Sequence, residues 1–430
     1  MMKVAILTNF NEFHPGYSLT GIVCDQARML YEHGNEVHVF ASEEFNDKSF
    51  PAPAKATLHA GPGRGVPQSK LIDYRSRDDI SPEHVKHANR IADFLARELQ
   101  DFDIAFSHDW IFTGWNLPYS AGIKMANQRL PKLGWMHWLH SIPTQHFDWW
   151  RGEEYGHRHR IISPSKSMIN HTHDAYKCDR EMIVAIPHIK DLRTWFDFSD
   201  EACDFIADHP NAMQADVVCV YPASSDRLTA KNVGAVISII GAMKRRCLSV
   251  CLIIANQWAT GRQRRQDLQQ FIDLAEEAKL AVDSEFIFTS EWRRPQYSTG
   301  ISKRFLRELM MCGNLFIFPT REESFGLVSP EAALCGNFLV LNRNLPVLGE
   351  VLLDEGLYLP FHSFENQLNV DPDVWIHILD HYAGVILSRM RHNESIMTRT
   401  MVRQTLNYDR LYLRHYEPLM HELIRESEQS

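Results

Sequence analysis

The sequence predicts an α/β protein made of two successive units, each with a parallel sheet covered by helices on both faces. Three observations support this. The chain has 430 residues, which is long for one domain at roughly 150 residues per domain. Its apolar fraction of 44% and charged fraction of 23% are typical of globular proteins. Short apolar runs alternate with helical patterns, and the alternation occurs twice along the chain.

In the first half, two helices stand out between the apolar runs. One extends from about Val23 to Glu32 and stops at Gly34, and the other begins at Ser81-Pro82, a cap followed by proline at the first helical position. The runs that we assign to buried strands are residues 4–7, 37–41, 104–106, 133–139, 161–163 and 183–186. Residues 51–67 are rich in Ala, Gly and Pro and are predicted to form a loop.

The alternation restarts after residues 190–214, a less patterned stretch without a sustained strand. We therefore predict one domain over 1–192 and a second over 193–407. The strands expected in the second are residues 217–221, 250–255, 286–289, 315–318, 338–341 and 357–359, with helices near 232–246, 264–279, 302–312 and 330–335. A last helical pattern at 408–425 is long enough to return to the first domain.

Charge and composition exclude several classes of protein. Lys and Arg number 45 against 54 Asp and Glu, a net charge of −9 that disfavours a general phosphate-backbone binder. Neither a membrane-length apolar stretch nor a secretory signal pattern is present, so we expect a cytoplasmic protein. The eight cysteines form no C-x-x-C pair and are expected to be reduced core residues.

The segment 319–336 carries the most informative pattern of polar residues. It follows a predicted strand, and Ser329 is expected to cap a helix that has Pro330 at its first position and ends at Gly336. A loop that leads into a helix start collects free backbone N–H groups, which favours an anion. Glu331 falls in the first helical turn, where a carboxylate is favourable and can accept hydrogen bonds from a diol such as ribose. Glu323 lies in the loop itself.

A second polar segment follows the first strand of the second half. Arg227 and Lys231 lie there on one predicted loop, within residues 221–232. Two fixed cations at a strand end suit a diphosphate, which needs positive charge both to bind and to leave.

These two segments resemble the donor site of retaining family-four glycosyltransferases of the GT-B fold. The resemblance lies in a glutamate, seven residues and a second glutamate, with Phe-Gly after the first and Glu-Ala-x-x-x-Gly at the second. It implies two Rossmann-like domains facing across a cleft, with a C-terminal helix crossing back to the first. It also implies that Glu323 contacts the transferred sugar, that Glu331 contacts the ribose, and that Arg227 and Lys231 hold the diphosphate. The residues implied to lie near the donor are Ser324, Phe325, Gly326 and Leu327.

The resemblance implies fewer roles in the first domain. His140, after a predicted strand, would lie beside the donor sugar, and His108 and Asp109 follow a neighbouring strand. We assign His108, Asp109, Gly16 and Gly21 to the acceptor side. His137 is expected to pack on the opposite face from His140.

The function implied is retaining, metal-independent transfer of a sugar from a nucleotide diphosphate sugar, with a UDP-sugar favoured, to a hydroxyl acceptor. We expect no cofactor and no metal, because the closely spaced histidine pairs 137/140, 157/159 and 171/173 have no cysteine or carboxylate at a recognised spacing. The Asp-x-Asp triplets at 101–103 and 371–373 are interpreted as caps at element starts.

The identity of the acceptor stays open at this point. It could be a carbohydrate, a small molecule, a lipid-linked sugar or a modified DNA base. The Trp-, His- and Arg-rich residues 134–160 either face the acceptor or pack on the domain surface. Three other functions fit the same fold: a DNA-base (hydroxymethylpyrimidine) glycosyltransferase, which the basic residues 262–265 would suit, a nucleotide-sugar epimerase, and a non-enzymatic nucleotide-sugar binder.

Overall fold

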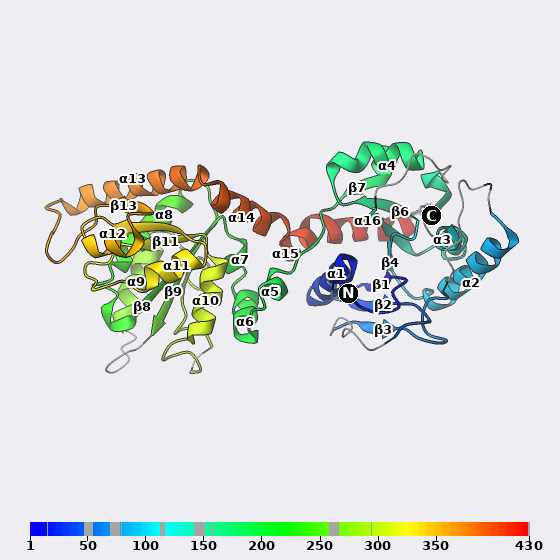
Figure 1. Ribbon diagram of the computed structural model, residues 1–430, viewed down its shortest axis with the longest axis horizontal. Helices are drawn as coiled ribbons and strands as arrows, with labels where there is room; N and C mark the ends of the chain where they lie inside the picture. The colour runs from blue at the N-terminus through cyan, green and yellow to red at the C-terminus, as the bar shows by residue number, and fades with distance from the viewer. Residues whose placement is uncertain are drawn as a thin grey trace. The chain divides into compact units, whose positions relative to one another are not determined.

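Two compact units make up the chain. The computed structural model describes residues 1–14, 16–46, 55–68, 78, 80–111, 117–141, 151–155, 158–257, 266–293 and 295–428. The first unit comprises Met1–Asp191 and Thr405–Ser430, and the second comprises Leu192–Gln404. Each unit has one parallel sheet with helices on both faces (Figure 1), which confirms the predicted α/β class.

The sheet of the first unit has seven parallel strands in the order β3-β2-β1-β4-β5-β6-β7. In its centre, Ile6 of β1 lies opposite Val39 of β2 and Phe106 of β4. The strands are β1 Lys3–Leu7, β2 Glu36–Phe40, β3 Thr57–His59, β4 Ile104–His108, β5 Gly134–Trp138, β6 His159–Ser163 and β7 Ile183–Ala185. The predicted loop at 51–67 is wrong for β3, because a three-residue edge strand is too short to show an alternating pattern.

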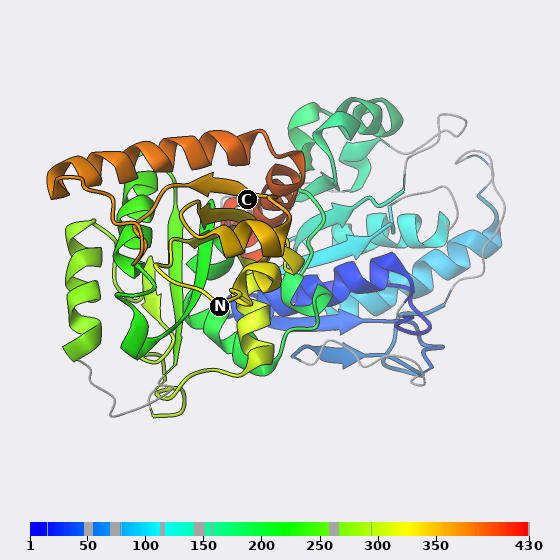
Figure 2. The ribbon, with the colours of Figure 1, turned by 60° about the vertical axis from the view of Figure 1, so that its left-hand side comes forward.

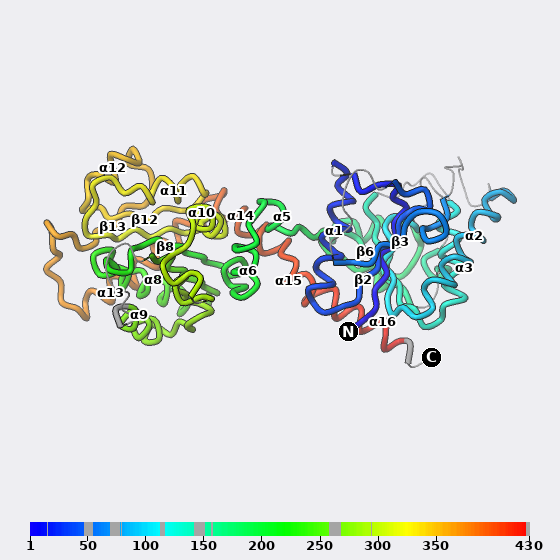
Figure 3. The backbone as a smooth tube through the Cα atoms, turned by 90° about the horizontal axis from the view of Figure 1, so that it is seen from below, coloured from blue at the N-terminus to red at the C-terminus, as the bar shows by residue number. Residues whose placement is uncertain are grey.

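Alternate residues of this sheet face two separate layers of helices. Val4 and Ile6 pack against α1 (Ser18–Glu32) and the C-terminal helices. Ala5 and Leu7 belong to the opposite layer, with α2 (Pro82–Glu98), α3 (Leu117–Arg129) and α4 (Ile169–Tyr176). Figures 1 and 3 show α2 and α3 side by side. Helix α2 begins as predicted, with Ser81 as its cap and a proline at its first position.

The C-terminal segment packs on the first unit and is not a single regular helix. It consists of α15 (Tyr408–Leu411), a π-helical turn at Tyr412–Tyr416, and α16 (Glu417–Glu428). Three tyrosines spaced four apart contact α1 and the turn after it: the Tyr408 hydroxyl bonds Glu32, the Tyr412 hydroxyl accepts from Asn35 Nδ2 (3.0 Å), and the Tyr416 hydroxyl accepts from Gln26 Nε2 (2.9 Å). This row of tyrosines joins the end of the chain to its beginning.

The sheet of the second unit has six parallel strands in the order β10-β9-β8-β11-β12-β13. The strands are β8 Val217–Ser224, β9 Val250–Gln257, β10 Phe286–Phe288, β11 Leu315–Phe318, β12 Phe338–Asn342 and β13 Leu357–Leu359. Strand order reverses between β8 and β11, which makes that point the topological switch of the sheet. Ligands in open α/β sheets bind outside the carboxyl ends of the strands at such a switch.

Helices cover both faces of the second sheet as well. Cys219 and Tyr221 face the layer that contains α8 (Val233–Lys244), α9 (Gln266–Glu277), α11 (Val328–Leu334), α12 (Pro346–Leu352) and α13 (Pro372–Arg391). Figures 1 and 2 show the long α13 against α8. Val218 and Val220 face the layer of α6 (Asp200–Asp208), α7 (Asn211–Gln214) and α10 (Lys303–Cys312). The unit also contains the short α5 (Leu192–Trp195) and most of α14 (Glu394–Thr405), whose last residue belongs to the first unit.

Candidate functional site

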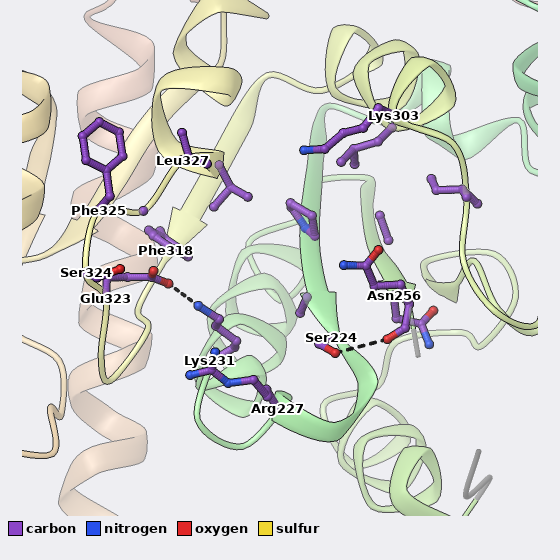
Figure 4. Close-up of a pocket in the computed structure, with 18 residues that line it drawn as sticks. Ser224, Arg227, Lys231, Asn256, Lys303, Phe318, Glu323, Ser324, Phe325 and Leu327 are labelled. Carbon is purple, nitrogen blue, oxygen red and sulfur yellow. Dashed lines mark hydrogen bonds and ion pairs between the residues drawn. The ribbon is translucent and has the colours of Figure 1, made fainter. Parts of the chain in front are cut away.

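A cavity of about 390 Å³ lies at the carboxyl edge of the second sheet. The ends of β8, β9 and β11 and the start of α10 surround it, so it occupies the topological switch (Figure 4). Of the predicted donor-site residues, all but Glu331 line this cavity: Arg227, Lys231, Glu323, Ser324, Phe325, Gly326 and Leu327. Residues 92 positions apart in the chain, Lys231 and Glu323, meet here in an ion pair.

Hydrogen bonds to main-chain carbonyls fix the two loops that carry these residues. The chain leaves β8 through a short 3-10 turn at Ser225–Arg227 and reaches Asn232 in a left-handed conformation, at φ 55°. Asn232 Nδ2 donates to the Pro319 carbonyl (3.1 Å), and the Arg321 amide donates to the Ala230 carbonyl (3.0 Å). The loop after β8 and the loop after β11 are therefore held against one another.

Gly326 fixes the path of the loop between β11 and α11. Its φ is +78°, and an added Cβ would lie 2.9 Å from Leu348 Cδ2 and 3.3 Å from Phe318 Cε1. The prediction that Ser329 caps α11 is wrong, because the helix begins at Val328. Ser329 lies buried in the first turn, where its hydroxyl and its amide both donate to the Gly326 carbonyl (2.8 and 2.9 Å). The serine thus closes the loop onto the helix.

Three cation–glutamate pairs dominate the electrostatics around the cavity. They are Arg227–Glu322, Lys231–Glu323 and Lys303–Glu331. The three glutamates all come from the segment 322–331, whereas the cations come from two other elements. Figure 4 shows Lys231 pointing at Glu323, and these two side chains are only 15% and 14% exposed. Each of the three cations that line the cavity, among the residues that the structure describes, is therefore already paired with a carboxylate.

Glu331 lies at a boundary between two cavities. It lines a second, largely apolar cavity of about 680 Å³ together with Met310 and Leu334. Lys303 and Leu306 line both cavities. Lys303 Nζ lies 3.0 Å from Glu331 Oε1, and the side chain of Glu331 is 38% exposed. The predicted ribose ligand is thus adjacent to the first cavity without lining it.

Three residues at the site were missed by sequence reasoning. Glu322 is out of register with the glutamate spacing, so the motif does not indicate it, and nothing in the sequence points to Lys303. Asn256 is fully buried at the end of β9, and its Nδ2 donates to both Ser225 Oγ and Ser290 Oγ at 2.8 Å. A polar residue that ends the apolar run 250–255 was the one available signal for Asn256.

In the first unit, three predicted residues come together at the ends of β4 and β5. His108 Nδ1 and His140 Nε2 share a hydrogen bond of 2.8 Å. The Asp109 carboxylate accepts from the His140 amide (2.7 Å) and the Ser141 hydroxyl (3.1 Å), and burial raises its pKa. Burial, followed by the nearby His188, lowers the pKa of His140 to about 3. Burial likewise holds the pKa of His108 well below its usual value, so both imidazoles are neutral at pH 7.

The remaining first-unit predictions have mixed outcomes. His137 is buried on the opposite face and bonds Ser107 Oγ (2.8 Å), as expected. Gly16 is exposed, and its amide donates to His14 Nδ1 (3.1 Å). Gly21 lies in the first turn of α1 and not in the loop that precedes this helix. The helix begins at Ser18, so the loop is shorter than the sequence suggested.

The aromatic and basic segment 134–160 is partly structural. Its first residues form β5, and Arg160 pairs with Glu422 and Glu426 of α16. Trp149, Trp150 and His157 lie outside the described residues, as does the basic cluster 262–265.

The structure also bears on the predictions about cysteines, metal ligands and membrane helices. All eight cysteines are free thiols, but the prediction that they are core residues is wrong for Cys247, which is exposed. Within the described ranges, no three or more His, Cys, Asp or Glu side chains are grouped to hold a metal ion. None of the described helices has the length and apolar character needed to cross a membrane.

The fold defines a protein of two Rossmann-like units, with a cavity lined by Arg227, Lys231 and Glu323 at the switch point of the second. Residues 22–193 match the family model described as Glycosyltransferase Family 4. This part of the chain is therefore a glycosyltransferase domain. The match lies almost wholly in the first unit, whereas the donor-site motifs lie in the second, so the two observations are independent.

Several solved structures also match the chain, whereas no curated protein sequence does. A glycosyltransferase from Rickettsia africae is 12% identical over 98% of each chain, with a TM-score of 0.33. HepE from Anabaena in complex with UDP-glucose is 13% identical over 100% of each chain, with a TM-score of 0.32. Sucrose-phosphate synthase from Thermosynechococcus elongatus is 13% identical over 100% of this chain and 99% of that one, with a TM-score of 0.31. At these TM-scores, the fold assignment rests on the sheet topology of the chain itself.

Proposed function

We propose that the protein is a retaining, metal-independent glycosyltransferase that moves a sugar from a nucleotide diphosphate sugar to a hydroxyl acceptor. One observation carries the proposal: a single cavity at the switch point collects Arg227, Lys231, Glu323 and the backbone of residues 324–327. These are the groups that the donor-site resemblance requires, and they lie in a chain whose other unit carries the family-four domain. The eight free thiols suit a reducing cytoplasm as its location.

In this proposal, Arg227 and Lys231 bind the donor diphosphate. Both lie in the turn that follows β8 and both line the cavity. Fixed cations stabilise the negative charge that develops on the diphosphate as the bond to the sugar breaks. Because the chain itself supplies this charge, the proposed transfer needs no bound metal. The incoming hydroxyl would attack on the face that the diphosphate leaves, which retains the configuration of the sugar.

Glu323 and Glu331 would recognise the two ends of the donor. The Glu323 carboxylate is 14% exposed and points into the cavity at Lys231, where it can accept hydrogen bonds from sugar hydroxyls. Glu331 stands in the first turn of α11 at the cavity boundary, and its carboxylate can accept both hydroxyls of a ribose. His140 would line the reacting face as a neutral imidazole, since its pKa is lowered to about 3 by burial.

A donor screen tests the proposal. Thermal unfolding of the full chain is measured with UDP-, GDP- and ADP-sugars, because a ligand that binds the folded state raises the midpoint. The stabilising donor is then incubated with carbohydrate, small-molecule, lipid-linked and modified-DNA acceptors, and the anomeric configuration of the product is determined. A new sugar without any acceptor would identify an epimerase instead. Binding without turnover on any acceptor would identify a nucleotide-sugar binder.

Two variants test the assigned roles. Arg227→Ala should lower kcat/KM roughly 30- to 900-fold, which corresponds to about 2–4 kcal/mol for a lost charged contact to a leaving group. Glu323→Gln should also lower transfer sharply, with the fold intact. Arg245→Ala is the matched control, because Arg245 is an exposed arginine of the same unit that pairs with Asp380 (2.9 Å) and does not line the cavity. Full activity of either site variant would remove that residue from the mechanism.

A further inference from the structure

The cations of the cavity pair with one more glutamate than the proposed donor contacts use. Of the three glutamates that pair with its cations, Glu323 and Glu331 have proposed contacts with the sugar and the ribose. Glu322 has neither, yet its carboxylate is the one bonded to Arg227, which is proposed to bind the diphosphate. The structure therefore places an anion where a phosphate is expected.

A diphosphate that binds Arg227 or Lys231 competes with the carboxylate already paired to that cation. The phosphates would otherwise approach cations whose charge is already balanced, and the neighbouring carboxylates would repel them. The Lys231–Glu323 pair is costly to open, because its two side chains are 15% and 14% exposed. The Arg227–Glu322 pair is 47% and 51% exposed, so water can solvate both groups once they separate.

The backbone around Glu322 allows its side chain to move alone. Thr320 Oγ1 donates to the Glu322 carbonyl (3.0 Å), and the preceding amide of Arg321 donates to the Ala230 carbonyl (3.0 Å). These two bonds fix the main chain of the loop at Arg321 and Glu322. The Glu322 side chain can then rotate into solvent without displacing Glu323.

We propose that Glu322 is the resident anion of the diphosphate subsite: its carboxylate leaves Arg227 when a diphosphate binds and returns to Arg227 when the nucleoside diphosphate product departs. This inference rests on the proposed function and adds to it a residue that sets donor affinity and product release. Glu322 lowers the affinity for the product, because every departure restores an ion pair. No covalent step involves it.

Titration calorimetry of the full chain with UDP tests this role. Glu322→Gln keeps the shape of the side chain and removes its charge, so it should tighten UDP binding about two- to fivefold, the range expected for losing a competing exposed ion pair. Glu285→Gln is the matched control: it makes the same change in net charge, but Glu285 pairs with Lys244 away from the cavity. It should leave the UDP affinity unchanged.

A double-mutant cycle tests whether the effect passes through Arg227. In an Arg227→Gln background, Glu322→Gln should give no gain in UDP affinity. Unchanged or weaker UDP binding by Glu322→Gln alone would overturn the proposal. An equal gain in the Arg227→Gln background would also overturn it, because the effect would then be one of general charge.

Inorganic pyrophosphate separates this proposal from the proposed function. If the wild-type chain binds none of UDP, GDP and ADP, the assignment of a nucleotide donor fails. The same cycle is then measured with pyrophosphate, which probes the cations without a nucleoside. A gain by Glu322→Gln that requires Arg227 still supports the resident anion, and no gain refutes it.

Discussion

Lys231→Met isolates the most buried ion pair of the site. The methionine keeps an apolar chain of similar length but leaves the Glu323 carboxylate, 14% exposed, without its cation. Breaking a fully buried pair from one side costs about 3–5 kcal/mol. The remaining exposure of both side chains reduces this to about 2–3 kcal/mol. For a unit of about 200 residues, a loss of that size lowers the unfolding midpoint by roughly 4–12 °C.

Thermal unfolding of the full chain, followed by calorimetry, measures this loss. The double variant Lys231→Met with Glu323→Gln should recover most of it, because the second change removes the uncompensated charge. Lys244→Met is the control, since Lys244 also pairs with a glutamate but is 34% exposed, and it should cost at most about 1 kcal/mol. A midpoint for Lys231→Met within 1 °C of the wild type would refute the reasoning, as would a double variant no more stable than the single one.

Three further predictions address the loop, the first unit and its C-terminal segment. Gly326→Ala should weaken UDP binding about tenfold in calorimetry. Gly34→Ala is the control, because Gly34 also has a positive φ but has open space around it, and it should leave UDP binding unchanged. If Gly326→Ala bound UDP as tightly as the wild type, the assignment of this loop to the donor site would be contradicted. Burial raises the pKa of Asp25 to about 6. The protonated carboxyl therefore favours the folded state at low pH, and this stabilisation is lost as the pH rises from about 4 to 7. Asp25→Asn should make the free energy of unfolding depend less on pH over this range. Tyr416→Phe removes the bond from Gln26 and should lower the unfolding midpoint of the first unit by roughly 2–6 °C; an unchanged midpoint would mean that this bond contributes nothing.

The sheets were predictable from sequence because both of their faces are buried. A strand covered on both sides must be apolar throughout, so runs such as 250–255 and 315–318 appear directly in the sequence and in the structure. Helix α3 was not predicted. Its sequence includes proline, serine and glycine, and it is held by burial among its neighbours instead of by helix propensity. A helix buried in this way shows no alternation of apolar and polar residues in its sequence.

Some of the site residues could also be predicted from the sequence, and others could not. Glu323 and Lys231 could be placed together because each stands next to a predicted strand end, and parallel strands end at one edge. The partner of Arg227 could not be predicted, because Glu322 is out of register with the glutamate spacing and only the two loop conformations bring its side chain to Arg227. The left-handed backbone of Asn232 and the closed loop at Gly326 set those conformations. Neither loop conformation produces a periodic pattern of apolar residues from which it could be predicted.

The row of tyrosines at the C-terminus has a consequence for biosynthesis. Tyr412, Tyr416 and Leu423 complete a core on one face of the first sheet, whose strands were made more than 200 residues earlier. During synthesis from the N-terminus, the second unit can bury its core before that face is covered. The first unit therefore reaches its native state last, and a ribosome that stops short of α16 releases a chain with an exposed apolar sheet.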